Sequence, residues 1–327
     1  MRVLLLGATG TIGQATALAL LNHGHELVCL VREKSGAQRS TASTEKLLST
    51  AGASIQYGNV LDTASLANEK WLQQPFDVLV SCLASRNGTT KDAWAIDYQA
   101  HSHWLNLAKD KGIKHFVLLS AICVQKPKLG FQQAKLAFEN ELIASGLTYS
   151  IVRPTAFFKS LSGQVKRLQQ GKPFLLFGDG KLTACKPISD HDLGQYMAMC
   201  LTNEHLQNAV LPIGGPGPAI TPLQQGEYLF KLKGQQPRFM HVPVALLDAI
   251  IFVLKALGWL IPALADKAEL AQIGRYYATE SMLVWDSAKA VYDEHGTPSF
   301  GDQTLFSHYQ QMLEGSVQVE LGDHAVF

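Results

Sequence analysis

Three glycines near the start of the chain have a spacing that suits phosphate binding. They lie in Gly7-Ala8-Thr9-Gly10-Thr11-Ile12-Gly13, directly after the apolar run Val3 to Leu6 and before a helical pattern. Glycine permits a tight turn, and the N–H groups that open a helix can face a pyrophosphate. A glycine turn used only for packing is the alternative, but the strand before it and the helix after it favour dinucleotide binding. The expected contacts are Gly7, Thr9, Gly10, Thr11, Ile12 and Gly13.

Arg32 is the first residue after the second apolar run, Glu26 to Val31. An acidic residue at this point would bind the 2′-hydroxyl of NADH, whereas the planar guanidinium of arginine suits the 2′-phosphate of NADPH. Glu33 is a discordant neighbour, and Arg32 as an ordinary solvated charge is the alternative. The sequence favours NADPH as the cofactor.

Later runs end in further candidate cofactor contacts, because ligands of such folds collect at the carboxyl ends of strands. Asn59 and Val60 are expected beside the adenine, whereas Asp62 is interpreted as a helix cap. The remaining contacts are expected at the ribose (Cys82, Leu83 and Ala84) and near the nicotinamide (Pro154, Thr155, Ala156 and Phe157).

These runs alternate with amphipathic segments through the first 160 residues, which predicts an α/β fold: a Rossmann-type, doubly wound parallel sheet with a smaller C-terminal substrate lobe. Residues 1–157 should bind the cofactor and 158–327 mainly the substrate, and a helix near 189–202 should return to the first domain. Residues 33–46 are polar and are interpreted as a loop. The expected strands are 3–6, 26–31, 54–58, 78–81, 115–119 and 149–152, and the expected helices include 12–22, 94–109 and 131–145.

A lysine follows a phenylalanine by one helical turn in Phe131-Gln132-Gln133-Ala134-Lys135. In this arrangement, and in its glycine spacing, the chain resembles the short-chain reductases, in which a tyrosine in place of Phe131 donates a proton. Without that tyrosine, ordinary alcohol or ketone chemistry is not expected. Ser120 matches the serine of the same site, where it would contact substrate or nicotinamide, although a serine that caps the turn is an alternative.

Longer segments closely resemble divinyl chlorophyllide 8-vinyl reductases, atypical members of the short-chain family. They are Leu118 to Pro127, Ile151 to Ser160, Phe177 to Lys181, Pro212 to Gly217, Ile273 to Tyr277 and Glu280 to Met282. The resemblance covers nearly the whole chain. It implies NADPH-dependent reduction of the 8-vinyl group of divinyl chlorophyllide or protochlorophyllide to ethyl, in chlorophyll or bacteriochlorophyll biosynthesis. Because the first strand begins near Met1, with no plastid transit segment before it, we expect a bacterial, photosynthetic source.

Lys135 has three interpretations within this resemblance. It holds the hydroxyls of the nicotinamide ribose, as in relatives that keep the tyrosine; it donates the proton, with its pKa lowered by an apolar pocket; or it is a surface lysine. Two other functions stay open: reduction of another conjugated alkene, quinone or aromatic ether, and a non-catalytic NADPH-binding subunit or sensor.

A tetrapyrrole requires apolar walls and a cation for its propionate. The candidates are Phe158, Lys159, Arg167, Arg275 and Tyr276, although aromatic residues at this density usually form core. Residues 242–262 are strongly apolar and are interpreted as a helix that covers the substrate cleft or, alternatively, touches a membrane surface.

Composition limits the partners. The 327 residues are 47% apolar and 17% charged, with a formal net charge of +1 and no dense basic run, so nucleic acid is not expected. The five cysteines are interpreted as buried thiols, and His101, His103 and His191 as surface or capping residues, so no protein-bound metal is predicted; magnesium would arrive with the substrate. No apolar stretch reaches the roughly 18 residues of a spanning helix, which predicts a soluble, cytoplasmic protein, peripheral at most on photosynthetic membranes. The oligomeric state stays open.

Overall fold

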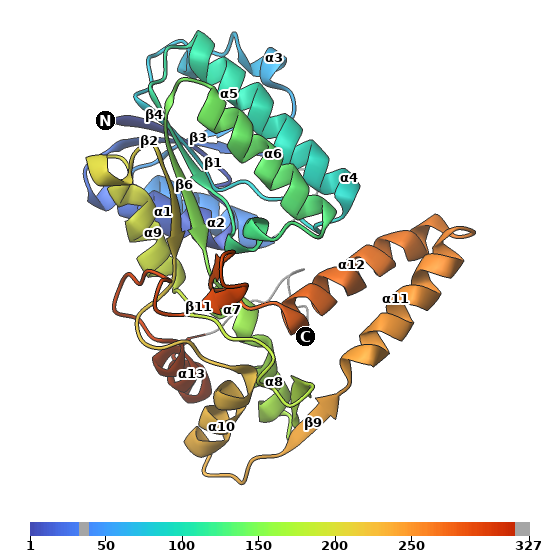
Figure 1. The fold of residues 1–327 in the computed structure, drawn as a ribbon. Coiled ribbons are helices and arrows are strands. Elements are labelled where there is room, and N and C mark those ends of the chain that lie inside the picture. Colours follow the sequence, from blue (N-terminus) through green and yellow to red (C-terminus); the bar gives the residue numbers. More distant parts are fainter. Residues whose placement is uncertain (33–38, 318–327) are drawn as a thin grey trace. The chain divides into compact units, whose positions relative to one another are not determined.

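The computed structural model describes residues 1–32 and 39–317, which form two compact units (Figure 1). Of these residues, the first unit comprises those within Met1–Ser85, Lys91–Pro154 and Asp190–Leu211, and the second those within Arg86–Thr90, Thr155–Ser189 and Pro212–Phe327. Residues 190–211, which include the helix expected near 189–202, thus belong to the first unit. The short segment Arg86–Thr90 belongs to the second unit, which the sequence did not predict. Each unit is described by itself.

A seven-stranded sheet forms the centre of the first unit, with strand order β3-β2-β1-β4-β5-β6-β8. Strands β1 to β6 pair in parallel, which confirms the predicted doubly wound fold. The chain crosses from β3 to β4 between the two halves of the sheet, so the carboxyl ends of β1 and β4 flank the switch point where ligands bind in such folds. The strands are β1 (Arg2–Leu6), β2 (Glu26–Val31), β3 (Ser54–Tyr57), β4 (Val78–Ser81), β5 (His115–Leu119), β6 (Thr148–Pro154) and β8 (Ala209–Ile213).

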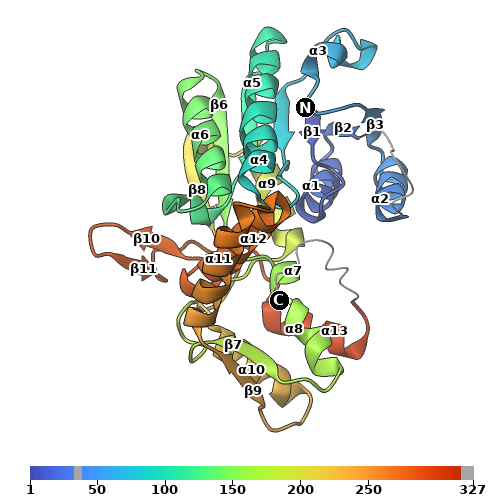
Figure 2. The ribbon, with the colours of Figure 1, turned by 90° about the vertical axis from the view of Figure 1, so that its right-hand side faces the viewer.

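Helices cover both faces of this sheet. Helix α1 (Thr11–Asn22) packs against α9 (Asp190–Met199) on one face, and α5 (His101–Asp110) and α6 (Gly130–Ala144) lie side by side on the other (Figures 1 and 2). The short helices are α3 (Thr63–Leu66), η1 (Lys70–Leu72), α4 (Thr90–Ala93), the π-helical η2 (Trp94–Ala100), η3 (Ile122–Gln125) and η4 (Glu204–Leu206). Asp62 caps α3 by accepting a hydrogen bond from the Ser65 N–H, as predicted.

The loop predicted for residues 33–46 is wrong in its second half, because α2 spans Arg39–Thr50. Residues 33–38 lie outside the described residues. Helix α2 is mostly polar, but two of its side chains, Glu45 and Leu48, are buried and lie three residues apart on one helical face. Glu45 also accepts a hydrogen bond from the Tyr57 hydroxyl at 3.0 Å. These tertiary contacts outweigh weak local helix propensity.

One core cluster of the first unit lies where α5 and α6 cover the sheet. Its largest fully buried side chains are Trp104, Phe116 and Phe138, and the rings of Phe116 and Phe138 pack at 5.6 Å between centroids. The indole N–H of Trp104 donates to the Val60 carbonyl at 2.9 Å, which ties the loop after β3 to α5.

The second unit is built around a smaller core. Strands β7 (Phe174–Phe177) and β9 (Phe239–Val242) pair in parallel, and Phe174, Leu229, Phe230 and Tyr309 belong to the buried cluster beside them. The other elements are α7 (Phe158–Leu161), α8 (Gly163–Gln169), α10 (Pro222–Leu232), α11 (Val244–Gly258), α12 (Pro262–Thr279), β10 (Val284–Asp286), β11 (Val291–Asp293) and α13 (Leu305–Glu314).

Residues 242–262 contain the predicted helix, although it is shorter than the apolar segment. The segment is the end of β9, helix α11 and a bend into α12, and the two helices pack as an antiparallel hairpin (Figure 1). At the bend, a Cβ on Gly258 would lie 3.0 Å from the backbone nitrogen of Ala265, so glycine permits the close approach. Pro262 begins α12, where its missing N–H costs nothing. Ile251 is the one buried residue of α11.

Candidate active site

The glycine turn between β1 and α1 has the geometry of a phosphate-binding loop. Gly7 has a φ of +80°, and a Cβ there would lie 2.7 Å from the Cys82 backbone. A Cβ on Gly13 would lie 2.0 Å from the Gly7 carbonyl oxygen, so both glycines are required for packing. A Cβ on Gly10 would meet only that same oxygen, at 3.5 Å, and Gly10 brings no side chain to the start of α1. The turn is therefore open at Gly10, where the backbone can approach a ligand.

The other predicted contacts of the first unit follow the carboxyl ends of neighbouring strands. Arg32 is exposed directly after β2. Asn59 is exposed after β3, where its Oδ1 accepts a hydrogen bond from the Leu61 N–H at 3.1 Å, whereas the Val60 side chain is part of the core. Cys82 and Leu83 are half-buried and Ala84 is exposed after β4. Parallel strands thus bring these residues to one edge of the sheet, beside the glycine turn.

The predicted nicotinamide loop lies at the end of β6, where the first unit gives way to the second. Pro154 belongs to the first unit and Thr155, Ala156 and Phe157 to the second. Within the second unit the Thr155 N–H donates to the Ile213 carbonyl at 2.9 Å, and its hydroxyl donates to the Lys186 carbonyl. Contact of this loop with a nicotinamide stays a prediction.

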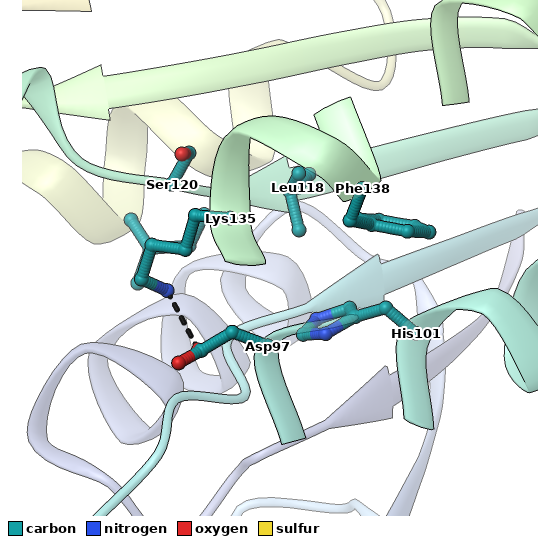
Figure 3. Close-up of a pocket in the computed structure, with 7 residues that line it drawn as sticks. Asp97, His101, Leu118, Ser120, Lys135 and Phe138 are labelled. Atoms are coloured by element: carbon teal, nitrogen blue, oxygen red, sulfur yellow. Dashed lines mark hydrogen bonds and ion pairs between the residues drawn. The ribbon is translucent and has the colours of Figure 1, made fainter. Parts of the chain in front are cut away.

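A small pocket between β5 and α6 contains the predicted catalytic residues Lys135 and Ser120 (Figure 3). Lys135 comes from α6, one turn after Phe131, whose side chain is buried. Its Nζ lies 2.9 Å from Oδ1 of Asp97 on η2, and the Asp97 side chain is fully buried. A buried anion thus holds Lys135 in a pocket that is not purely apolar, and its role as proton donor stays a prediction.

Sequence reasoning missed Asp97. A signal was present, because Asp97 occupies the apolar face of a helical pattern, together with Ala93, Ala100 and Trp104. A carboxylate in such a position requires a buried partner, and buried charges are usually paired. The π-helical form of η2 is a further signal, visible only in the structure, since π-helical turns are rare and are often found at functional sites.

His101 is buried beneath the same pocket, so its prediction as a surface or capping residue is wrong. Its Nδ1 lies 2.8 Å from the Ile96 carbonyl, which can only accept, so Nδ1 carries the proton. Nε2 therefore accepts from the Ser81 hydroxyl at 2.8 Å. Burial, and to a smaller extent the nearby Lys135 cation, lower the pKa of His101 to about 4 against the opposing effect of Asp97. The neutral ring is a fixed link between β4 and η2.

Ser120 lies at the pocket as predicted, but its hydroxyl already has a partner. It donates to Oε1 of Glu139, a fully buried carboxylate on α6. Arg153 on β6 donates to the same carboxylate, with its Nε 3.1 Å from Oε2. This buried Ser120–Glu139–Arg153 network fixes α6 against β5 and β6. A contact of Ser120 with substrate would require its hydroxyl to exchange partners.

Comparison with known proteins identifies the family. A family model described as NAD(P)H-binding matches residues 7–204. The chain is 48% identical over 331 residues to the divinyl chlorophyllide a 8-vinyl-reductase of Oryza sativa subsp. indica, spanning 99% of this chain and 82% of that protein. The Arabidopsis thaliana protein of the same name is also 48% identical, over 99% of this chain and 79% of its own length. The chain belongs to the divinyl chlorophyllide a 8-vinyl-reductase family.

Solved structures show the same fold at lower identity. The NADPH complex of leucoanthocyanidin reductase from Vitis vinifera superposes with a TM-score of 0.68 at 19% identity, over 95% of this chain and 99% of that one. An isoflavone reductase gives a TM-score of 0.69 at 16% identity, over the same shares. The predicted membership of the 8-vinyl-reductase family, the oxidoreductase class and the NAD(P)H-binding domain are confirmed by the sequence comparisons.

The predicted substrate residues of this 8-vinyl-reductase family member are dispersed over the second unit. Phe158 belongs to its buried core and packs its ring against His308, and Tyr276 is also buried. Arg275 pairs with Asp248 on α11, and both side chains remain about half exposed. Two further cations are partly exposed: Lys159, and Arg167, whose Nε donates to the Pro173 carbonyl at 2.8 Å.

The remaining histidines and the cysteines show no arrangement typical of a metal site. His103 and His191 are exposed, as predicted. Cys29, Cys123, Cys185 and Cys200 are buried thiols, again as predicted, and Cys82 is half-buried, with its pKa raised to about 12 by burial. Within residues 1–32 and 39–317, no three histidine, cysteine or acidic side chains are grouped as metal ligands.

Proposed function

We propose that the chain reduces the 8-vinyl group of divinyl chlorophyllide or protochlorophyllide to ethyl with NADPH. The observation that carries this proposal is the full-length 48% identity to proteins named for that reaction. Two features of the site support it: the glycine turn is open at Gly10, and a buried lysine pocket is present without the usual tyrosine.

The missing tyrosine agrees with the chemistry of a conjugated alkene. When bound, NADPH supplies a hydride, which a vinyl group conjugated to a macrocycle accepts at its outer carbon. The negative charge spreads into the ring, so no acid is required to stabilise an oxyanion, and Phe131 suffices where a phenol would stand. A proton then adds to the inner vinyl carbon and completes the ethyl group. The chain's part is to orient the reactants and exclude water, effects worth several kcal/mol.

The first unit holds the cofactor in this proposal. The Gly10 turn receives the pyrophosphate, and Arg32 donates to the 2′-phosphate, which makes NADPH the preferred nucleotide. Lys135 directs its ammonium towards the hydroxyls of the nicotinamide ribose, since Asp97 accepts only part of its hydrogen-bonding capacity. Contact of the loop Pro154 to Phe157, which begins in this unit, with the nicotinamide is part of the proposal.

The second unit holds the pigment. Its propionate carboxylate pairs with one of the accessible cations, Lys159, Arg167 or Arg275, and Arg275 must then exchange Asp248 for the ligand. Phe158 and Tyr276 support this surface from the core instead of contacting the ring. The magnesium ion enters and leaves with the pigment.

The same unit also makes peripheral contact with a lipid bilayer in our proposal. The ten residues from Ala256 to Ala265, around the bend of the α11–α12 hairpin, carry no charged side chain. Trp259 is 88% exposed and Leu260 70% exposed. Tryptophan and leucine at such exposure suit the interface of a membrane, on which a hydrophobic pigment would also reside. None of the helices in the described residues is long and apolar enough to span a membrane.

The test incubates the protein with divinyl chlorophyllide and either NADPH or NADH, and follows the pigment's Soret band and mass. A blue shift with a gain of two hydrogens, faster with NADPH, is expected. Unchanged pigment despite tight NADPH binding would refute the reaction and favour another conjugated substrate or a non-catalytic subunit.

Lys135→Ala should lower turnover about 100-fold or more, because the cofactor loses its orienting contact. Near-normal turnover in this variant would show that Lys135 does not position the cofactor.

A further inference from the structure

The carboxylate of Asp97 connects two parts of the first unit that are expected to bind the cofactor ribose. Its Oδ1 accepts from Lys135 Nζ at 2.9 Å and from the Ser85 N–H at 3.2 Å. Ser85 directly follows the ribose segment Cys82 to Ala84. One oxygen atom thus links α6 to the loop after β4, although Lys135 lies 38 residues further along the chain.

The second oxygen of Asp97 has no hydrogen-bond partner among the described residues, although it is completely buried. A buried acceptor without a donor is unfavourable, and such groups are uncommon in folded proteins. Asp97 lines the same pocket as Lys135 and Ser120 (Figure 3). The need to hold the Lys135 cation gives a reason for keeping a carboxylate whose second oxygen has no donor.

Hydrogen bonds hold the helix that carries Asp97 against β4 and the loop that follows it. Its helix η2 is π-helical, and the neutral His101 ring ties this helix to Ser81 at the end of β4. The Ser81 hydroxyl oxygen in turn accepts from the Leu83 N–H at 3.3 Å. Two separate links, Ser81–His101 and Ser85–Asp97, therefore fix the loop after β4 to the helix that carries Asp97.

We propose that Asp97 is the positioning residue of the nicotinamide-ribose subsite: its Oδ1 holds Lys135 and the loop after β4 where the ribose hydroxyls bind. The proposal rests on the cofactor site assigned above. Asp97 acts through Lys135 and takes no part in hydride or proton transfer. Removing its charge should therefore matter only while Lys135 is present.

The test is a double-mutant cycle with Asp97→Asn, Lys135→Met and the double variant. The dissociation constant for NADPH is measured by fluorescence, and kcat with divinyl chlorophyllide is measured separately. Asp97→Asn should weaken NADPH binding about tenfold and lower kcat about 10- to 100-fold, because displacements of about 1 Å have effects of that size. In the Lys135→Met background the same substitution should change either quantity less than about threefold. Effects that multiply in the double variant would overturn the proposal.

Controls separate this role from a loss of folding. Glu45→Gln removes another buried carboxylate of the same unit, which lies on α2, so it should leave binding and turnover unchanged. Thermal unfolding shows whether each variant folds; should Asp97→Asn unfold, Asp97→Glu keeps the charge but moves it by one methylene group, and should lower kcat. Wild-type kcat with an Asp97→Glu protein would refute positioning. The binding cycle tests Asp97 even if the pigment reaction fails.

Discussion

Burial and hydrogen-bond partners determine the protonation state and the pairing of individual side chains in the pocket. His101 shows this most clearly, because its surroundings admit only the neutral ring with the proton on Nδ1. Lys135 and Asp97 form a buried ion pair, and breaking a buried pair by removing one partner is usually more destabilising than the pair is stabilising. The residues that position the chemistry are thus also residues on which folding depends.

The pH dependence of stability should report the buried state of His101. Its pKa is about 4 in the folded chain and ordinarily 6.5 in an unfolded one, so the unfolded chain binds a proton first as the pH falls. This contribution, about 3 kcal/mol, is complete above pH 6.5 and is lost as the pH falls towards 4. Urea unfolding at pH 7 and pH 5 should therefore show a smaller pH effect in His101→Gln than in the wild type. The exposed neighbour His103→Gln should keep the wild-type difference; an equal difference in all three proteins would contradict the assignment.

At the scale of elements, the glycines of the turn between β1 and α1 are needed for different reasons. Gly13 is required because a Cβ there would meet the Gly7 carbonyl, whereas a Cβ on Gly10 has room in the protein itself. Gly10 has a φ of −75°, which any residue adopts, so folding alone does not explain a glycine at this position. A bound phosphate group provides a reason for it.

Alanine substitutions should separate these two tasks. Gly10→Ala should unfold at the wild-type temperature but bind NADPH roughly tenfold more weakly, because the methyl group occupies the approach of the pyrophosphate. Gly13→Ala should lose about 1–3 kcal/mol of stability through overpacking. Thermal unfolding and NADPH titration measure the two effects. Wild-type affinity in Gly10→Ala would show that the phosphate does not bind at this turn.

At the scale of the whole molecule, cofactor and pigment are assigned to different compact units. The first unit contains the open glycine turn and the Lys135 pocket, and the second contains the accessible cations and the α11–α12 hairpin. The hairpin carries the three most exposed large apolar side chains of the described residues: Trp259 (88%), Phe252 (75%) and Leu260 (70%). Exposed apolar side chains gathered in one place mark an interaction site.

Vesicle flotation should test the hairpin as a membrane contact. The wild type should float with phosphatidylcholine vesicles that contain phosphatidylglycerol. The double variant Trp259→Ser with Leu260→Ser should bind at least about tenfold more weakly, because two large apolar side chains no longer enter the interface. The matched control replaces Leu61 and Leu182, which are 42% and 50% exposed elsewhere, and should float like the wild type. Wild-type protein that stays at the bottom would refute membrane contact.

The sequence by itself determined the fold class, the glycine turn and the strands β1 to β6, but not β8 at the edge of the sheet. These features depend on local periodicity and on the glycines between a strand and a helix, which can be recognised over a few neighbouring residues. It also indicated Lys135 and Ser120, through the resemblance to short-chain reductases. It did not indicate that α2 begins at Arg39, because the buried contacts of Glu45 and Leu48 are tertiary.

Only the tertiary structure decided what surrounds the catalytic candidates. Asp97 meets Lys135 across 38 residues, Glu139 meets Ser120 across 19, and His101 meets Ser81 across 20. These contacts form because parallel strands and their covering helices bring distant segments to the same edge of the sheet. As a result the Asp97 carboxylate is paired with Lys135, the buried His101 ring is neutral, and the Ser120 hydroxyl is hydrogen-bonded to Glu139. Periodicity shows that a face is buried, but not which partner it meets.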